Sequence, residues 1–187
     1  MKLKQEVSSK KQKKINMDLT AVNDFFERVQ TQAFGENIQE AVKLLTNASS
    51  IIFIGVGNSS IIGKYGARYF NNVGWFSFAI DDPFTPVFRG KGEKTATIAL
   101  SVSGETEQTL KLAEKLKKRG GSLISITNKA NCSLARMSDC NINYYIPSYQ
   151  TDGMDYDLTS QMAVVFIIEL IGRELKGIYN DADDILM

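Results

Sequence analysis

The stretch TATIALSVSGETEQTLKLAEKLKKRGG, residues 95–121, decides the fold. Its first part, TATIALSV (95–102), is a nearly continuous apolar run, which is typical of a strand buried on both faces. Its second part, TEQTLKLAEKLKKRGG (106–121), has apolar residues at helical spacing and ends in glycine, so it predicts a helix. A strand that leads at once into a helix is the repeating unit of a parallel sheet covered by helices.

The same alternation runs through most of the chain. Further strands are predicted at 50–56, 75–80, 122–128 and 142–147, and further helices at 18–30, 36–48, 59–74, 131–139 and 158–177. Parallel strands joined by short connections need right-handed crossovers, which place helices on both faces of the sheet. The sequence therefore predicts an α/β fold, a three-layer α-β-α sandwich with a five-stranded parallel sheet in flavodoxin-like order.

The 187 residues suffice for one domain, which we expect at 18–180 and which includes the N-terminal helices. Residues 1–17 are predicted to be a lysine-rich flexible tail, and residues 181–187 an acidic C-terminal tail. The net charge of +1 is unevenly distributed, because residues 1–14 hold six lysines and one glutamate, or +5, which leaves −4 for the rest. We interpret the lysine-rich segment as solvated; the alternative is contact with an acidic partner.

The composition restricts the class of protein. The longest apolar run, MAVVFII (162–168), is too short to cross a bilayer, and no secretory signal follows the first lysines. The two cysteines, Cys132 and Cys140, are too few for a disulfide framework. We therefore expect a cytoplasmic protein with no membrane partner. The chain has no histidine, so we expect no metal and no cofactor, and catalysis would depend on carboxylates, lysine or tyrosine.

Two polar loops follow strands in this pattern. GVGNSS (55–60) follows the first predicted strand and SVSGET (101–106) follows the third, and each leads directly into a helix. A helix start supplies free N–H groups and a partial positive charge, and Ser101, Ser103 and Thr106 add hydroxyl groups. The two loops together predict a site for one phosphorylated small molecule, whereas either loop alone is equally consistent with a capped turn.

A dinucleotide site is the competing interpretation of the first loop. Gly55 and Gly57 follow a strand, and Asp81 or Asp82 at the end of the second strand would bind a ribose. The third glycine of that fingerprint is missing, because Ser60 stands in its place. The two aspartates, which precede a proline, are better explained by a turn.

The segments 51–60, 100–128 and 131–147 resemble the SIS (sugar isomerase) domain family, and the likeness extends over roughly residues 18–177. Within that family the chain is most similar to the phosphosugar-sensing domain of RpiR-type transcriptional regulators. The resemblance implies a phosphosugar ligand, with the residues of the two loops as its contacts. The phosphate side would be Ser101, Val102, Ser103, Gly104 and Thr106, and the sugar side Gly57, Asn58, Ser59 and Ser60.

The resemblance also implies partners and leaves the activity open. The ligand would be a phosphorylated sugar or amino sugar, and the protein a homodimer or homotetramer. The regulators carry a helix-turn-helix before this domain, whereas residues 1–17 are a lysine-rich tail, so DNA is expected as a partner only through a domain absent from this chain. We expect a non-catalytic effector-sensing module; the alternatives are a small aldose-ketose isomerase of the 6-phospho-3-hexuloisomerase kind and a structural oligomer.

Several further polar residues are candidates for an isomerase. Glu105 is interpreted as an acid that complements a helix start. The acids Asp152, Asp155 and Asp157 are interpreted as helix caps, with a lid over the crevice as the alternative. Glu169, inside the apolar terminal helix, is interpreted as half of an intersubunit pair. The remaining candidates are Tyr144 and Tyr145, of which at least one is expected in the core, and the loop residues Arg89 and Lys91.

Overall fold

A parallel sheet forms the middle layer of the computed structural model, which describes residues 19–82, 84–86, 94–147 and 159–186, with side chains as far as Ile178. All neighbouring strands run parallel, in the order β2-β1-β3-β4-β5. The strands are β1 (Ser50–Ile54), β2 (Ser77–Ile80), β3 (Thr95–Ser101), β4 (Ser122–Thr127) and β5 (Cys140–Asn143). The predicted five-stranded sheet and its flavodoxin-like order are confirmed.

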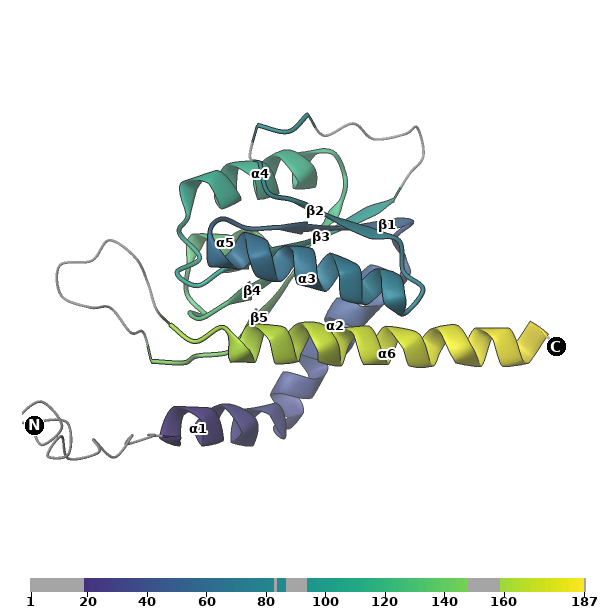
Figure 1. The fold of residues 1–187 in the computed structure, drawn as a ribbon, viewed down its shortest axis with the longest axis horizontal. Helices are drawn as coiled ribbons and strands as arrows, with labels where there is room; N and C mark the ends of the chain where they lie inside the picture. Colours follow the sequence, from purple (N-terminus) through teal and green to yellow (C-terminus); the bar gives the residue numbers. More distant parts are fainter. Residues whose placement is uncertain (1–18, 83, 87–93, 148–158, 187) are drawn as a thin grey trace, which may run out of the picture.

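Helices cover both faces of this sheet (Figure 1). They are α1 (Thr20–Val29), α2 (Gln32–Thr46), α3 (Asn58–Asn72), α4 (Glu107–Lys118), α5 (Ser133–Met137) and α6 (Met162–Leu186). One apolar core lies between the sheet and the layer formed by α2, α3 and α6, and a second lies between the sheet and α4 with α5. The predicted three-layer sandwich is therefore confirmed.

The terminal helix α6 is buried more deeply than one sheet face requires. Its inward side chains are fully buried at Ala163, Val164, Ile167, Ile168, Ile171 and Leu175. The helix packs against α2 and α3 as well as the sheet, and Phe166 contacts the ring of Phe25 in α1. Neighbouring helices of the same chain thus cover much of the apolar surface that the sequence showed. The helix also includes residues 181–186, which the sequence predicted as a tail.

The last strand differs most from its predicted position. The prediction placed it at 142–147, whereas β5 ends at Asn143. The chain bends at Tyr145, whose φ is +43°, and no extended strand continues through that conformation. Ile146 then bonds to the side chain of Asn128 instead of a strand neighbour.

Within the described residues, no helix combines the length and the apolar character that crossing a bilayer would require.

Candidate functional site

The two predicted loops lie at the carboxyl ends of adjacent strands. β1 pairs with β3, and Ile54 at the end of β1 is in register with Ala99, so Ser101 reaches two residues beyond β1. The following helices, α3 and α4, cover opposite faces of the sheet. This is the switch point in strand order, where parallel α/β folds bind ligands. The sequence therefore placed both loops correctly with respect to the sheet.

The 101–106 loop is held in shape by its own hydroxyl groups. Ser101 is buried at the end of β3, and its Oγ accepts a hydrogen bond from the Gly104 N–H at 3.1 Å. The same oxygen lies 3.0 Å from Oγ1 of Thr106. Ser103 Oγ accepts from the Glu105 N–H at 3.1 Å. The three hydroxyl groups thus fix the turn from β3 into α4.

Neither helix at the switch point begins with a side-chain cap. Thr106 is the N-cap of α4, but its hydroxyl makes no cap bond and pairs with Ser101 instead. Gly57, with φ +60°, is the N-cap of α3 and has no side chain to offer. By contrast, Thr31 and Cys132 cap α2 and α5, while α1 also begins without a cap. The first N–H groups of α3 and α4 are therefore donors without a side-chain acceptor, which suits an anion.

The 55–60 loop exposes only part of its polar surface. Gly57 and Asn58 are exposed, and no atom lies within 4 Å of a Cβ built on Gly57. Ser59 is buried and packs under Gly55, where an added Cβ would lie 2.9 Å from that of Ser59. Ser60 Oγ donates back to the Gly57 carbonyl at 2.9 Å. Ligand contact by Gly57, Asn58, Ser59 and Ser60 stays a prediction, as it does for the 101–106 loop.

The short helix α5 supports the 101–106 loop from below, a contact that the sequence did not predict. The Leu134 N–H donates to the Gly104 carbonyl at 3.0 Å, and the Ser133 N–H donates to Glu105 Oε1 at 2.8 Å. Cys132 fills the space beside Gly104, because a Cβ on that glycine would lie 2.1 Å from its Sγ.

Glu105 serves the start of α5. Hydrogen bonds from the side chain and the backbone of Ser133 hold the pKa of its carboxyl below the usual range. The acid thus complements a helix start, as predicted, but that of α5 and not of α4.

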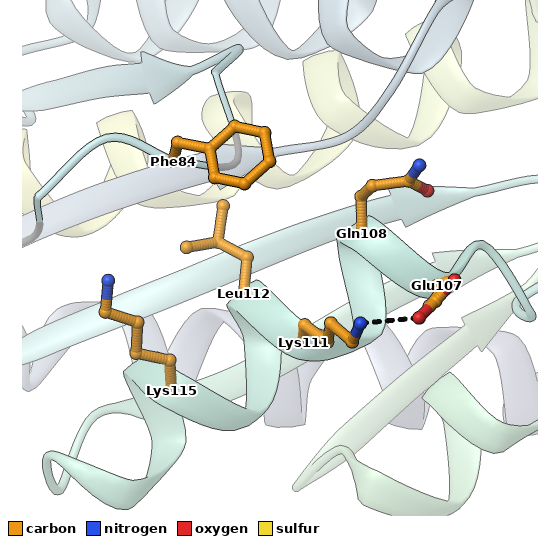
Figure 2. Close-up of a pocket in the computed structure, with 6 residues that line it drawn as sticks. All are labelled: Phe84, Glu107, Gln108, Lys111, Leu112 and Lys115. Atoms are coloured by element: carbon orange, nitrogen blue, oxygen red, sulfur yellow. Dashed lines mark hydrogen bonds and ion pairs between the residues drawn. The ribbon is translucent and has the colours of Figure 1, made fainter.

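A cavity of about 290 Å³ runs along the side of α4 (Figure 2). It begins at the first turn of the helix, where Figure 2 shows Lys111 paired with Glu107 and Phe84 opposite Leu112. Its lining residues are Phe84, Glu107, Gln108, Lys111, Leu112 and Lys115. None of the predicted ligand residues lines this cavity, although it borders the helix start to which they belong.

A family model described as SIS domain matches residues 44–168. The chain belongs to the SIS domain family. Among curated relatives, an uncharacterized protein of Archaeoglobus fulgidus is 30% identical over 65% of this chain and 64% of its own length. An uncharacterized HTH-type transcriptional regulator of Clostridium perfringens is 25% identical over 74% of this chain and 50% of its own length. The chain thus spans less than two thirds of either relative.

Solved SIS structures share the fold. The protein c3406 of E. coli CFT073, in complex with a phosphosugar, has a TM-score of 0.69 at 24% identity, and the match covers 86% of each chain. The sugar isomerase domain of an RpiR transcription factor from Sphaerobacter thermophilus has a TM-score of 0.66 at 17% identity, over 84% of this chain and 88% of its own. NanR of Vibrio vulnificus, complexed with ManNAc-6P, has a TM-score of 0.69 at 21% identity, over 88% of this chain and 63% of its own.

The remaining predicted candidates of this SIS domain have structural partners. Asp82 forms the predicted turn, because its Oδ1 accepts from the Phe84 N–H at 2.9 Å, and Asp81 pairs with Lys64. The hydrogen bond from Lys64 lowers the pKa of the Asp81 carboxyl. Asp152, Asp155, Asp157, Arg89 and Lys91 lie outside the described residues.

Glu169 has a partner within its own chain. Oε1 of Glu169 accepts a hydrogen bond from the hydroxyl of Tyr65 in α3 at 2.5 Å. This bond, with burial and the charge of Glu169, raises the pKa of Tyr65 to about 12. The predicted intersubunit pair is therefore replaced, in this structure, by a contact between α3 and α6.

The two tyrosines after β5 differ. Tyr144 is buried in the core, as predicted for at least one of them. Tyr145 is 57% exposed, and the guanidinium carbon of Arg28 lies 4.6 Å from the centre of its ring.

Proposed function

We propose that this SIS domain binds a phosphorylated sugar or amino sugar at the switch point between β1 and β3. We further propose that it is the effector-sensing module of an RpiR-type transcriptional regulator of carbohydrate metabolism, that it acts without catalysis, and that it works as a homodimer or homotetramer. One observation carries the proposal: α3 and α4 both start at this edge without a side-chain cap, beside hydroxyl groups. Supporting it, two related folds were solved with a phosphosugar, which is ManNAc-6P in NanR.

The phosphate group fits the start of α4. Its oxygens would accept hydrogen bonds from the free N–H groups of the first turn and from Ser103 and Thr106. The helix dipole favours the negative charge, so no lysine has to enter the site. The sugar would then extend toward Gly57 and Asn58 at the start of α3, which are the exposed residues of the other loop.

The alternative function is a small aldose-ketose isomerase. An isomerase needs a base to move a proton between neighbouring sugar carbons, and the chain has no histidine. Glu105 is the carboxylate in the 101–106 loop, and it is held by Ser133 with a lowered pKa. A carboxylate with a lowered pKa is a weak base, which favours sensing over catalysis.

A thermal-shift screen with hexose 6-phosphates and their N-acetylated analogues tests the proposal. A ligand at about a hundred times its Kd adds about 2.7 kcal/mol, and in a chain of this size each kcal/mol raises Tm by about 2–4 °C. We expect Ser103→Ala combined with Thr106→Ala to abolish the rise, and Ser49→Ala, an exposed serine before β1, to keep it. The absence of any rise across the panel would refute binding, and interconversion of aldose and ketose phosphates would identify an isomerase.

A further inference from the structure

Asn128 connects the 101–106 loop to the chain that follows β5. It is 4% exposed and follows β4. Its backbone N–H donates to the Val102 carbonyl at 3.1 Å. Its side-chain amide holds both backbone groups of Ile146: Nδ2 donates to the carbonyl at 2.6 Å, and Oδ1 accepts from the N–H at 2.5 Å. One buried residue thus holds the ligand loop with its backbone and a distant segment with its side chain.

The segment held by Asn128 contains a strained bend. Tyr145 has a φ of +43°, and among the described residues it is the only non-glycine with a positive φ. A bulky residue keeps this conformation only where its surroundings impose it. Both neighbours are fixed, since the Tyr144 N–H donates to the Thr127 carbonyl at 3.1 Å and Ile146 is held by Asn128. The bend therefore has a relaxed alternative that the Asn128 amide opposes.

The bend determines what α1 contacts. In the strained conformation the Tyr145 ring is presented to Arg28, whose guanidinium carbon lies 4.6 Å from the ring centre. Arg28 is in the last turn of α1. Stacking of a guanidinium on an aromatic ring is favourable, and it would be lost if Tyr145 relaxed to a negative φ. The state of the bend is thus coupled to a contact of the N-terminal helix.

We propose that Asn128 is a positioning residue for the 101–106 loop, and that Asn128, Tyr145 and Arg28 transmit occupancy of this loop to α1. The transmission rests on the phosphosugar site proposed above, whereas the positioning role of Asn128 does not. A ligand that orders the Val102 backbone also orders Asn128, because the two share a hydrogen bond. An ordered Asn128 stabilises the bend, and the bend keeps its ring against Arg28.

The positioning role is tested without ligand by hydrogen exchange of the whole chain, with Asn128→Asp compared against Asn131→Asp. The new carboxylate at position 128 cannot donate to the Ile146 carbonyl, so we expect about tenfold faster exchange at Ile146 and in residues 102–106, the factor for one lost hydrogen bond. Asn131 is exposed and only accepts from Arg136, which an aspartate also does, so its variant should match the wild type.

Acidification gives a second signature. A protonated carboxyl donates again, so exchange in Asn128→Asp, corrected for the intrinsic rate, should return toward the wild-type value as the pH falls. A role in packing alone would not depend on pH. Faster exchange at Ile146 with unchanged exchange in residues 102–106 would overturn the positioning role.

The transmission is tested with ManNAc-6P and with inorganic phosphate as probes. In the wild type we expect slower exchange in residues 102–106 and in α1. In Arg28→Ala only the loop should respond, and Arg28→Lys, which keeps a cation, should respond in part. Equal protection of α1 in the wild type and in Arg28→Ala, or none in the wild type, would overturn the transmission. If neither probe protects the loop, the ligand site and the transmission fail together, while the ligand-free comparison still decides the role of Asn128.

Discussion

Ser101 Oγ and Thr106 Oγ1 lie 3.0 Å apart across the 101–106 loop, and the same Ser101 oxygen accepts from the buried N–H of Gly104. The hydroxyl that ends β3 is thus a structural group as well as a predicted ligand contact. A ligand would meet a loop that is already shaped, which reduces the entropy lost on binding.

Ser101→Ala should therefore destabilise the fold. The substitution leaves the Gly104 N–H buried without its acceptor, at an expected cost of about 1–3 kcal/mol in the free energy of unfolding. Ser103→Ala is the matched variant in the same loop, because its partner, the Glu105 N–H, is exposed and can bond to water. Urea denaturation measures both, and equal losses for the two would contradict this account of the loop.

Gly104→Ala should be more severe. Its φ of +68° is strained for alanine, and the new Cβ would lie 2.1 Å from Cys132 Sγ and 2.7 Å from Cys132 Cβ. Strain and overpacking together should cost about 2–5 kcal/mol. Gly57→Ala has a similar φ but open space, so about 1–2 kcal/mol is expected there. Gly35→Ala, inside α2 with no atom near, should stabilise by about 0.5–1 kcal/mol. A different order of the three variants in denaturation experiments would show that Cys132 does not confine the loop.

Glu105 should make the stability depend on pH in the acid range. Its pKa is lowered in the folded state, chiefly by Ser133, so its contribution is present above the unfolded pKa and lost as the pH falls through the folded one. Glu105→Gln should be less stable than the wild type near neutral pH, and the two should converge in acid. Unfolding curves collected at several pH values check this, and a difference that persists in acid would assign the effect to something other than the charge.

Tyr65 should titrate late among the seven tyrosines. The hydrogen bond to Glu169 raises the pKa of Tyr65 to about 12, so the stability linked to it is complete below the unfolded pKa near 10 and is lost as the pH rises toward 12. Absorbance titration of tyrosinate should show one late group that disappears in Tyr65→Phe and shifts down in Glu169→Gln. A late group that survives both substitutions would belong to another tyrosine.

The sequence predicted those features that depend on local pattern. Apolar runs located every strand, and their alternation with helices implied the order that places the 55–60 and 101–106 loops side by side. Features that depend on contacts between distant residues were not predictable. No periodicity shows that Ser133 bonds to Glu105, that Tyr65 bonds to Glu169, or that Asn128 stops β5 by holding Ile146.

One signal in the sequence could have pointed to the support of the loop. Asn128 directly follows a buried strand, as the residues of the two loops do, and polar residues at such positions are candidates for the ligand edge. Its partner could not be foreseen, because Ile146 is an apolar residue that offers only its backbone.

The direction of α6 has a practical consequence. The helix runs from the edge where α3 and α4 begin to the opposite side of the molecule, where its last turn projects past the sheet (Figure 1). Immobilising the protein on a biosensor chip through this projecting end would leave the two loops facing the flowing solution.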